Sequence, residues 1–122
     1  MKAYLSRDSV SAADDIHAPH ARMISPQQDW DPASLASQIL QAYDLPNIDG
    51  GQATWVLSSN IPFVVFAQQW EKPQPINEFV LNPSELDLDG EELRLHWSYF
   101  AQLDPEVVLH VLRSLRLRAI IA

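Results

Sequence analysis

Residues 53–70, ATWVLSSNIPFVVFAQQW, constrain the fold more than any other part of this chain. Two apolar runs flank a Ser-Ser-Asn turn, a pattern that is typical of two antiparallel β-strands. Within each run the apolar side chains alternate onto both faces, as Val64 and Val65 illustrate. A strand that is apolar on both faces is usually central and covered on both sides. We therefore expect a sheet with helices packed on it and with Phe63–Ala67 in its central strand.

Two segments have the pattern of amphipathic helices. Each begins with an Asp-Pro pair, at positions 31 and 104. Aspartate is a good N-cap, and proline at the first helical position loses no hydrogen bond. Apolar residues then recur every three or four positions, so we expect helices near 32–43 and 105–117.

Shorter alternating segments predict the other strands. Residues 2–10 and 22–25 give two of them, and 93–102 gives a half-buried strand after an Asp89-Gly90 hairpin turn. The prolines at 73 and 75 predict an extended linker, because two prolines do not fit a hydrogen-bonded ladder. The fold class is therefore α+β. Residues 1–122 should form a single domain with a mainly antiparallel sheet of about five or six strands and two helices packed on it.

Composition excludes several classes of partner. The formal net charge is −8, so nucleic acid would be repelled and a basic protein would be attracted. The longest apolar run, 61–67, is too short to cross a bilayer, and the first eight residues lack the apolar stretch of a signal peptide. The chain has no cysteine. We expect a cytoplasmic protein with neither a membrane nor a nucleic acid as partner.

The strand end after Ala67 and the acidic segment before residue 93 are the candidate partner-binding residues. An aromatic anchor beside charged residues is the usual anatomy of a protein interface. Trp70 and the acidic hairpin could therefore form one surface; the alternative, which the strand pattern favours slightly, is a Trp70 side chain buried against a helix. The predicted members are Gln68, Trp70, Glu71, Glu85, Asp87, Asp89, Glu91 and Glu92.

The densest group of potential metal ligands comprises Asp14, Asp15, His17 and His20. Two imidazoles three residues apart and a carboxylate are suitable zinc ligands. No helix fixes their spacing, however, and a third strong ligand is missing, so a solvated loop with two ordinary histidines is the better explanation. The acidic hairpin does not match a calcium loop, because Gly90 follows Asp89 directly. We expect no metal and no cofactor.

Catalytic signatures are absent from the sequence. His96 and His110 are isolated along the chain, and Ser58 and Ser59 lack the flanking glycines of a nucleophile elbow. The chain has three glycines, too few for a phosphate-binding loop. We expect a protein without enzymatic activity.

These observations favour a small acidic protein-binding domain. Its most concrete form is an inhibitor or immunity-type protein that neutralises a basic toxin or nuclease, because electrostatic attraction would speed capture of a basic target. One alternative is a metal- or small-ligand-dependent enzyme that uses the Asp14–His20 loop. The other is a subunit of a larger assembly that buries a sheet edge or the apolar tail at 119–122.

Overall fold

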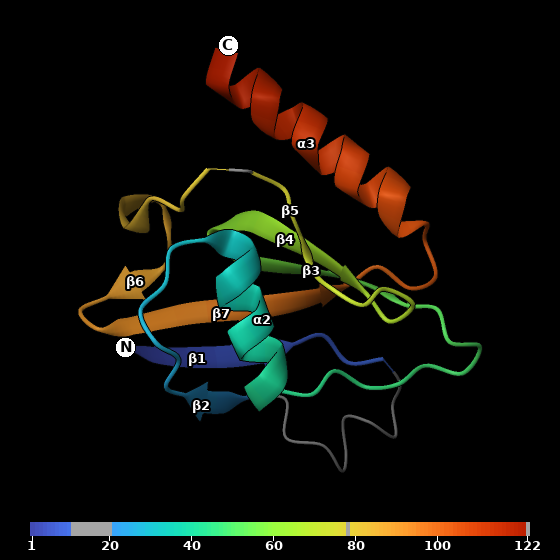
Figure 1. Ribbon diagram of the computed structural model, residues 1–122, viewed down its shortest axis with the longest axis horizontal. Coiled ribbons are helices and arrows are strands. Elements are labelled where there is room, and N and C mark those ends of the chain that lie inside the picture. The colour runs from blue at the N-terminus through green and yellow to red at the C-terminus, as the bar shows by residue number, and fades with distance from the viewer. Residues whose placement is uncertain (11–20, 78, 122) are drawn as a thin grey trace.

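The computed structural model describes residues 1–10, 21–77 and 79–121, except the side chains of 117–121. In this part of the chain seven strands form one sheet, and two α-helices pack on it (Figure 1). The strands are β1 (Lys2–Arg7), β2 (Arg22–Ile24), β3 (Thr54–Ser59), β4 (Ile61–Ala67), β5 (Gln74–Pro75), β6 (Leu88–Asp89) and β7 (Glu92–Tyr99). The helices are α2 (Pro32–Ala42) and α3 (Pro105–Ile121), and a short 3-10 turn, η1, spans Pro83–Glu85.

The sheet has the order β2-β1-β7-β3-β4-β5, and β6 pairs with the start of β7. Among these described strands the β1–β7 pair is parallel and the other pairs are antiparallel. The predicted α+β fold with a mainly antiparallel sheet is confirmed.

β3 and β4 form the predicted hairpin, but the middle of the sheet is occupied by β7 and β3, whereas β4, the strand expected to be central, lies next to the short edge strand β5. Asn60 makes the turn with a φ of 61°, a left-handed conformation that asparagine tolerates better than most residues. Trp55 and Val64 pack in the core on the α2 side, whereas Val56 and Val65 pack against α3. Both faces of this hairpin are therefore covered, as the sequence predicts.

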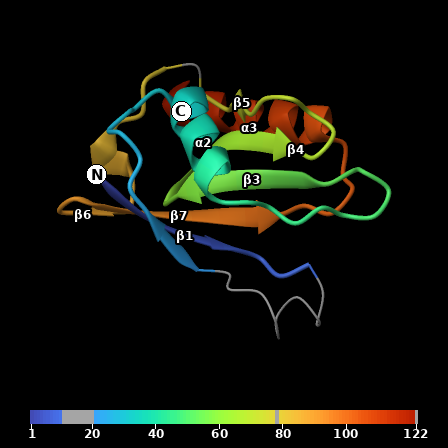
Figure 2. The ribbon, with the colours of Figure 1, turned by 60° about the horizontal axis from the view of Figure 1, so that its bottom comes forward.

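α2 begins as its cap residues predict. The Asp31 carboxylate accepts a hydrogen bond from the Ser34 backbone N–H at 2.9 Å. Leu35 and Ile39 are fully buried and turn the apolar side of the helix onto the sheet. Figure 2 shows α2 on one face of the sheet and α3 on the other, along β4 and β5.

β1 and β7 are covered by the described elements on one face only. Their α2-facing side chains are buried: Ala3, Leu5, Leu93, Leu95 and Trp97. On the opposite face Tyr4 and Arg94 are exposed, and they face each other across the strand pair. α3 lies on this same side of the sheet but over β4, so none of the described elements covers the β1–β7 half.

Two short strands refine the predictions. The linker expected around Pro73 and Pro75 is wrong in part, because Gln74–Pro75 pairs with β4 as the edge strand β5. An edge position accommodates Pro75, since a missing N–H on the outer side breaks no ladder hydrogen bond. The Asp89-Gly90 hairpin is confirmed, with Gly90 at a φ of 63°.

Candidate protein-binding surface

The acidic hairpin places most of its carboxylates around one cation. The Arg94 guanidinium lies 3.6 Å from Asp87, 3.8 Å from Asp89 and 3.9 Å from Glu92. β6 and β7 bring these residues together because Asp89 pairs with Glu92 across the turn. One arginine therefore faces three carboxylates, and the side chain of Asp89 remains 81% exposed. The hairpin keeps a negative surface.

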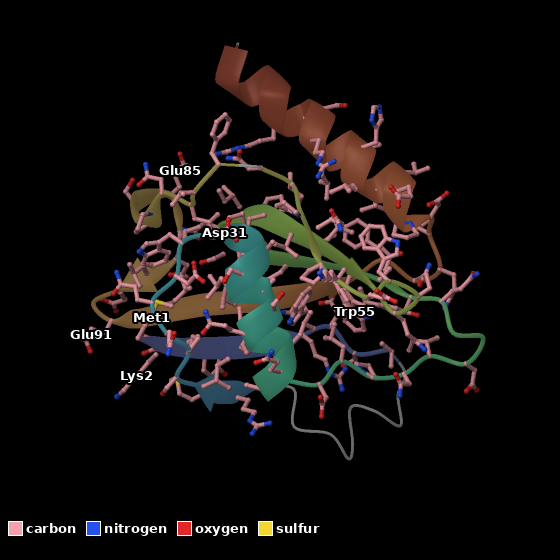
Figure 3. All side chains as sticks on the ribbon, in the orientation of Figure 1. Met1, Lys2, Asp31, Trp55, Glu85 and Glu91 are labelled. Carbon is pink, nitrogen blue, oxygen red and sulfur yellow. The ribbon has the colours of Figure 1, made fainter. Side chains whose placement is uncertain are left out.

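The fourth predicted carboxylate reaches the same end of the sheet from η1. Glu85 forms an ion pair of 2.9 Å with Arg116 of α3. Glu91, at the turn itself, is exposed. Figure 3 shows Glu85 and Glu91 at the end of the molecule that also holds Met1 and Lys2.

A pocket of about 300 Å³ opens beside these acids. It is lined by Met1, Gln28, Trp30, Pro83, Leu88, Gly90 and Glu91. Trp30 is half-buried against the core, and its carbonyl accepts a hydrogen bond of 2.6 Å from the Leu81 N–H. The aromatic group beside the acidic hairpin is thus Trp30, which the sequence analysis missed. The one sign of this role in the sequence is that a tryptophan occurs within an otherwise polar connection.

Two further carboxylates flank Trp30 in the chain. Asp29 receives hydrogen bonds from the Ser34 hydroxyl and the Asp31 N–H, and these lower the pKa of the Asp29 carboxyl below its ordinary value. It therefore stays ionised throughout the physiological range. Asp31 is exposed while it caps α2.

We call this region the hairpin end. Its members are Trp30, Asp29, Asp31, Glu85, Asp87, Asp89, Glu91 and Glu92. Among the described side chains, Lys2, Arg94 and Arg116 supply the positive charge there. Counting side chains alone, seven carboxylates and three cations give four negative units, half of the formal −8 of the whole chain.

The other predicted residues lie at the opposite end of the sheet. Trp70 follows the end of β4, where Thr54 pairs with Ala67, whereas the acidic hairpin precedes the start of β7. Seven residues of β7 lie between these two ends of the sheet, and at the rise per residue of a β-strand they span roughly 23 Å. The hypothesis of a single aromatic and acidic surface is therefore wrong, and Trp70 instead packs against α3, in agreement with the alternative of a tryptophan buried against a helix. A turn at Gln68-Gln69 breaks the strand alternation and sends Trp70 to the α3 face.

Gln68 has a structural partner. Its side-chain oxygen accepts a hydrogen bond from the Ile48 N–H at 2.8 Å, and its side-chain nitrogen donates to the Ile48 carbonyl at 3.3 Å. The amide thus fixes the connection between α2 and β3. Glu71 is exposed and lines a pocket of about 680 Å³ with Trp70 and Arg113.

Because Trp70 packs on Val108 and Leu109, we expect Trp70→Ala to act on folding. Removing a half-buried indole should lower the free energy of unfolding by about 2 kcal/mol. Urea denaturation would measure the change. A variant of unchanged stability would contradict the packing role of this side chain.

His96 belongs to a hydrogen-bonded array rather than being isolated as the sequence suggested. Its Nδ1 lies 2.7 Å from the Ser6 hydroxyl, and its Nε2 lies 2.7 Å from Asp8 Oδ1. The second oxygen of Asp8 accepts the Tyr99 N–H at 2.9 Å. A serine, a histidine and an aspartate in series are the components of nucleophilic catalysis. Here Ser6 lies within a strand, and Asp8 joins the end of β1 to β7, so we interpret the array as structural.

The array makes stability depend on pH. Partial burial alone would raise the pKa of the Asp8 carboxyl, but the Tyr99 N–H and the His96 ring outweigh it and the pKa lies below its ordinary value. Because the pKa of the Asp8 carboxyl is lower in the folded chain than in the unfolded chain, its ionised form stabilises the native state above about pH 4. This contribution is lost as the pH falls through the folded pKa.

We therefore expect Asp8→Asn to cost about 1 kcal/mol at pH 7, a modest value because solvent screens this exposed carboxylate. The difference from the unsubstituted chain should shrink as the pH falls below about 4, because the stabilisation is lost as the pH approaches the folded pKa. Urea denaturation at a series of pH values from 7 downward is the measurement. A difference that is the same at every pH would show that the carboxylate charge is not its cause.

The other potential metal ligands of the sequence analysis lie partly outside the described residues. Asp14, Asp15, His17 and His20 lie outside the described residues, so their predicted lack of metal stays a prediction. In the described part of the chain no three histidine or acidic side chains lie close enough to hold a metal ion. His110 is exposed on α3.

No family model, curated protein or solved structure matches this chain. No helix among the described residues combines the length and the apolarity that crossing a bilayer requires.

Proposed function

We propose that this chain is a cytoplasmic, non-catalytic protein-binding domain that captures a basic protein through the hairpin end. An inhibitor or immunity-type protein that neutralises a basic toxin or nuclease is its most concrete form. The observation that carries the proposal is the exposed acidic hairpin, in which Asp87, Asp89 and Glu92 surround Arg94, next to the Trp30 pocket that Glu91 lines.

The charge at this end supports fast capture of a basic target. Exposed carboxylates of one sign steer an oppositely charged partner during diffusion, and this effect acts mainly on the association rate. Asp89 and Glu91 are the most suitable for this role, because both are exposed at the tip of the hairpin.

The pocket supports specific binding once the partner has arrived. Half-buried tryptophans in pockets are frequent energetic centres of interfaces, where a rim of polar groups surrounds them. Trp30, Leu88 and Met1 offer an apolar site for one side chain of the partner. Glu91 at its border suits a long basic side chain or an apolar side chain next to one.

Capture from extracts of the native cell would test this function. We expect the immobilised protein to retain a basic protein, and the double substitution Asp89→Lys with Glu91→Lys to abolish its retention. The matched control reverses Asp44 and Asp49, two exposed acids on the loop after α2. Equal retention by the two double variants would exclude the hairpin end as the binding site.

A further inference from the structure

The pocket beside Trp70 lies away from the hairpin end. Its volume of about 680 Å³ falls within the roughly 300–1,000 Å³ of small-molecule sites. Trp70 and Lys72, on the loop after β4, line one side of the pocket, and Glu106 and Arg113 of α3 line the other. This loop lies at the opposite end of the sheet from the acidic hairpin. Occupancy of the pocket therefore does not depend on the proposed capture of a basic partner.

Charged side chains of both signs line this pocket. Two are basic, Lys72 and Arg113, and two are acidic, Glu71 and Glu106. Among the described residues, no ion pair joins any of these four side chains to each other or to another group. The pocket is thus balanced in charge within a chain of net charge −8, and its charges remain available to a ligand that carries both signs.

The guanidinium of Arg113 is held in place before any ligand arrives. Its Nε and Nη2 donate hydrogen bonds to the Pro75 carbonyl of β5, at 3.2 and 2.8 Å. A guanidinium has five N–H donors, so three of them are not used by this carbonyl. Because β5 already orders the side chain, binding a carboxylate there costs little further conformational entropy.

The helical repeat sets the order of the groups along α3. Glu106 and Arg113 are seven residues apart, about 20° short of two full turns, so both lie on one face with their Cα atoms about 10.5 Å apart. Leu109 lies between them and also lines the pocket. The half-buried Trp70 packs on Leu109, which gives an apolar surface between the two charges. The order along the pocket is therefore negative, apolar and positive.

A ligand with an ammonium group, an apolar side chain and a carboxylate in this order matches the pocket. A free amino acid carries both charges on one carbon, whereas an extended peptide of two or three residues spans about 7–10 Å. We propose that the pocket binds such a short zwitterionic peptide. Arg113 and Lys72 bind its carboxylate, and Glu106 binds its ammonium group. Its apolar side chain packs on Trp70.

Calorimetric titration of the full chain with Leu-Leu and Leu-Leu-Leu would test this site. We expect saturable binding of at least one peptide with a Kd below about 1 mM. N-acetylation or C-amidation of that peptide should weaken binding at least about ten-fold, because each removes one charge-assisted contact. In a parallel NMR titration the indole N–H signal of Trp70 should shift, whereas that of Trp30, in the other pocket, should not.

Two charge-neutralising variants assign the ends of the peptide. Glu106→Gln should weaken binding of the free peptide about ten-fold and leave its N-acetyl form unaffected, since that form has no ammonium group. Lys72→Gln should likewise weaken the free peptide but not its C-amide. Both residues are exposed, so neither substitution disturbs the core. The matched controls are Glu91→Gln and Lys2→Gln, exposed at the hairpin end, which should leave binding unchanged.

Two results would overturn the proposal. One is the lack of saturable binding of either peptide at concentrations up to about 10 mM, where a site of the expected affinity would be nearly filled. The other is binding that both Glu106→Gln and Lys72→Gln leave unchanged, which would place the peptide elsewhere on the molecule.

Discussion

Replacing Trp97 by alanine is expected to lower the free energy of unfolding by about 3–5 kcal/mol. Trp97 is fully buried on β7, in the core that α2 and the sheet enclose. It pairs with Arg7 on one side and with Leu57 on the other, so the indole fills the space where the two halves of the sheet meet. Its removal would leave a cavity that rigid strands on both sides cannot close. Urea denaturation followed by fluorescence of the remaining tryptophans would measure the loss.

Trp97→Phe distinguishes the contribution of ring packing to stability from that of the indole N–H. The Trp97 indole N–H is buried, and no described group of the protein accepts a hydrogen bond from it. An unsatisfied buried donor costs about 1–3 kcal/mol, so its removal offsets part of the lost contact area. We therefore expect Trp97→Phe to cost at least 2 kcal/mol less than Trp97→Ala. Equal losses in the two variants would show that shape rather than buried volume determines stability at this position.

Local patterns were sufficient to predict the elements of this fold. The Asp-Pro starts at 31 and 104 located both helices, because capping and proline geometry depend on adjacent residues alone. Alternation on both faces placed Phe63–Ala67 in a covered strand, since burial of both faces requires a layer on each side. The acidic hairpin followed from Asp89-Gly90, whose glycine takes the positive φ that the turn needs.

The pairing of strands that are far apart in the chain could not be predicted from the sequence. The contact of Ser6 and Asp8 with His96 depends on the parallel pairing of β1 with β7, and about 90 residues separate these strands in the chain. Neither strand carries a local signal of its neighbour, because the two alternating patterns fit several strand orders equally well. His96 therefore looked isolated in the sequence although it has two polar partners in the fold.

The aromatic residue of the candidate surface was misassigned for the same reason. Trp70 precedes the acidic hairpin by roughly fifteen to twenty residues in the chain. The antiparallel strands nevertheless place the two at opposite ends of the sheet. Trp30 is much farther from the hairpin in sequence but borders the same pocket. Sequence proximity indicated one surface, whereas strand direction decided which residues meet.

Reversing the charges of Asp89 and Glu91 to lysine is expected to slow association with a basic partner about ten-fold or more at low salt. Both residues are exposed at the hairpin tip, so the substitutions change the electrostatic field without removing core contacts. The four-unit change in charge turns the net charge of the hairpin end from four negative units to zero. Stopped-flow or surface-based kinetics with the captured basic protein would give the rates.

Salt provides the internal control for this mechanism. Near 1 M ionic strength the Debye length falls to about 3 Å, so the association rates of the variant and the unsubstituted chain should converge. The control variant with Asp44→Lys and Asp49→Lys carries the same net charge as the hairpin variant. It should slow association much less, because its substitutions lie outside the hairpin end. Equal slowing by the two variants would show that only total charge matters.

Trp30→Ala should affect the dissociation rate constant. Loss of an indole from the binding pocket removes short-range contacts, so dissociation should become at least about 30-fold faster, equivalent to about 2 kcal/mol, with little change in association. Trp30 also packs on the core, and thermal melting must therefore show that the variant is folded at the assay temperature. Folded Trp30→Ala with unchanged dissociation would remove the pocket from the interface and leave the carboxylates alone to bind the partner.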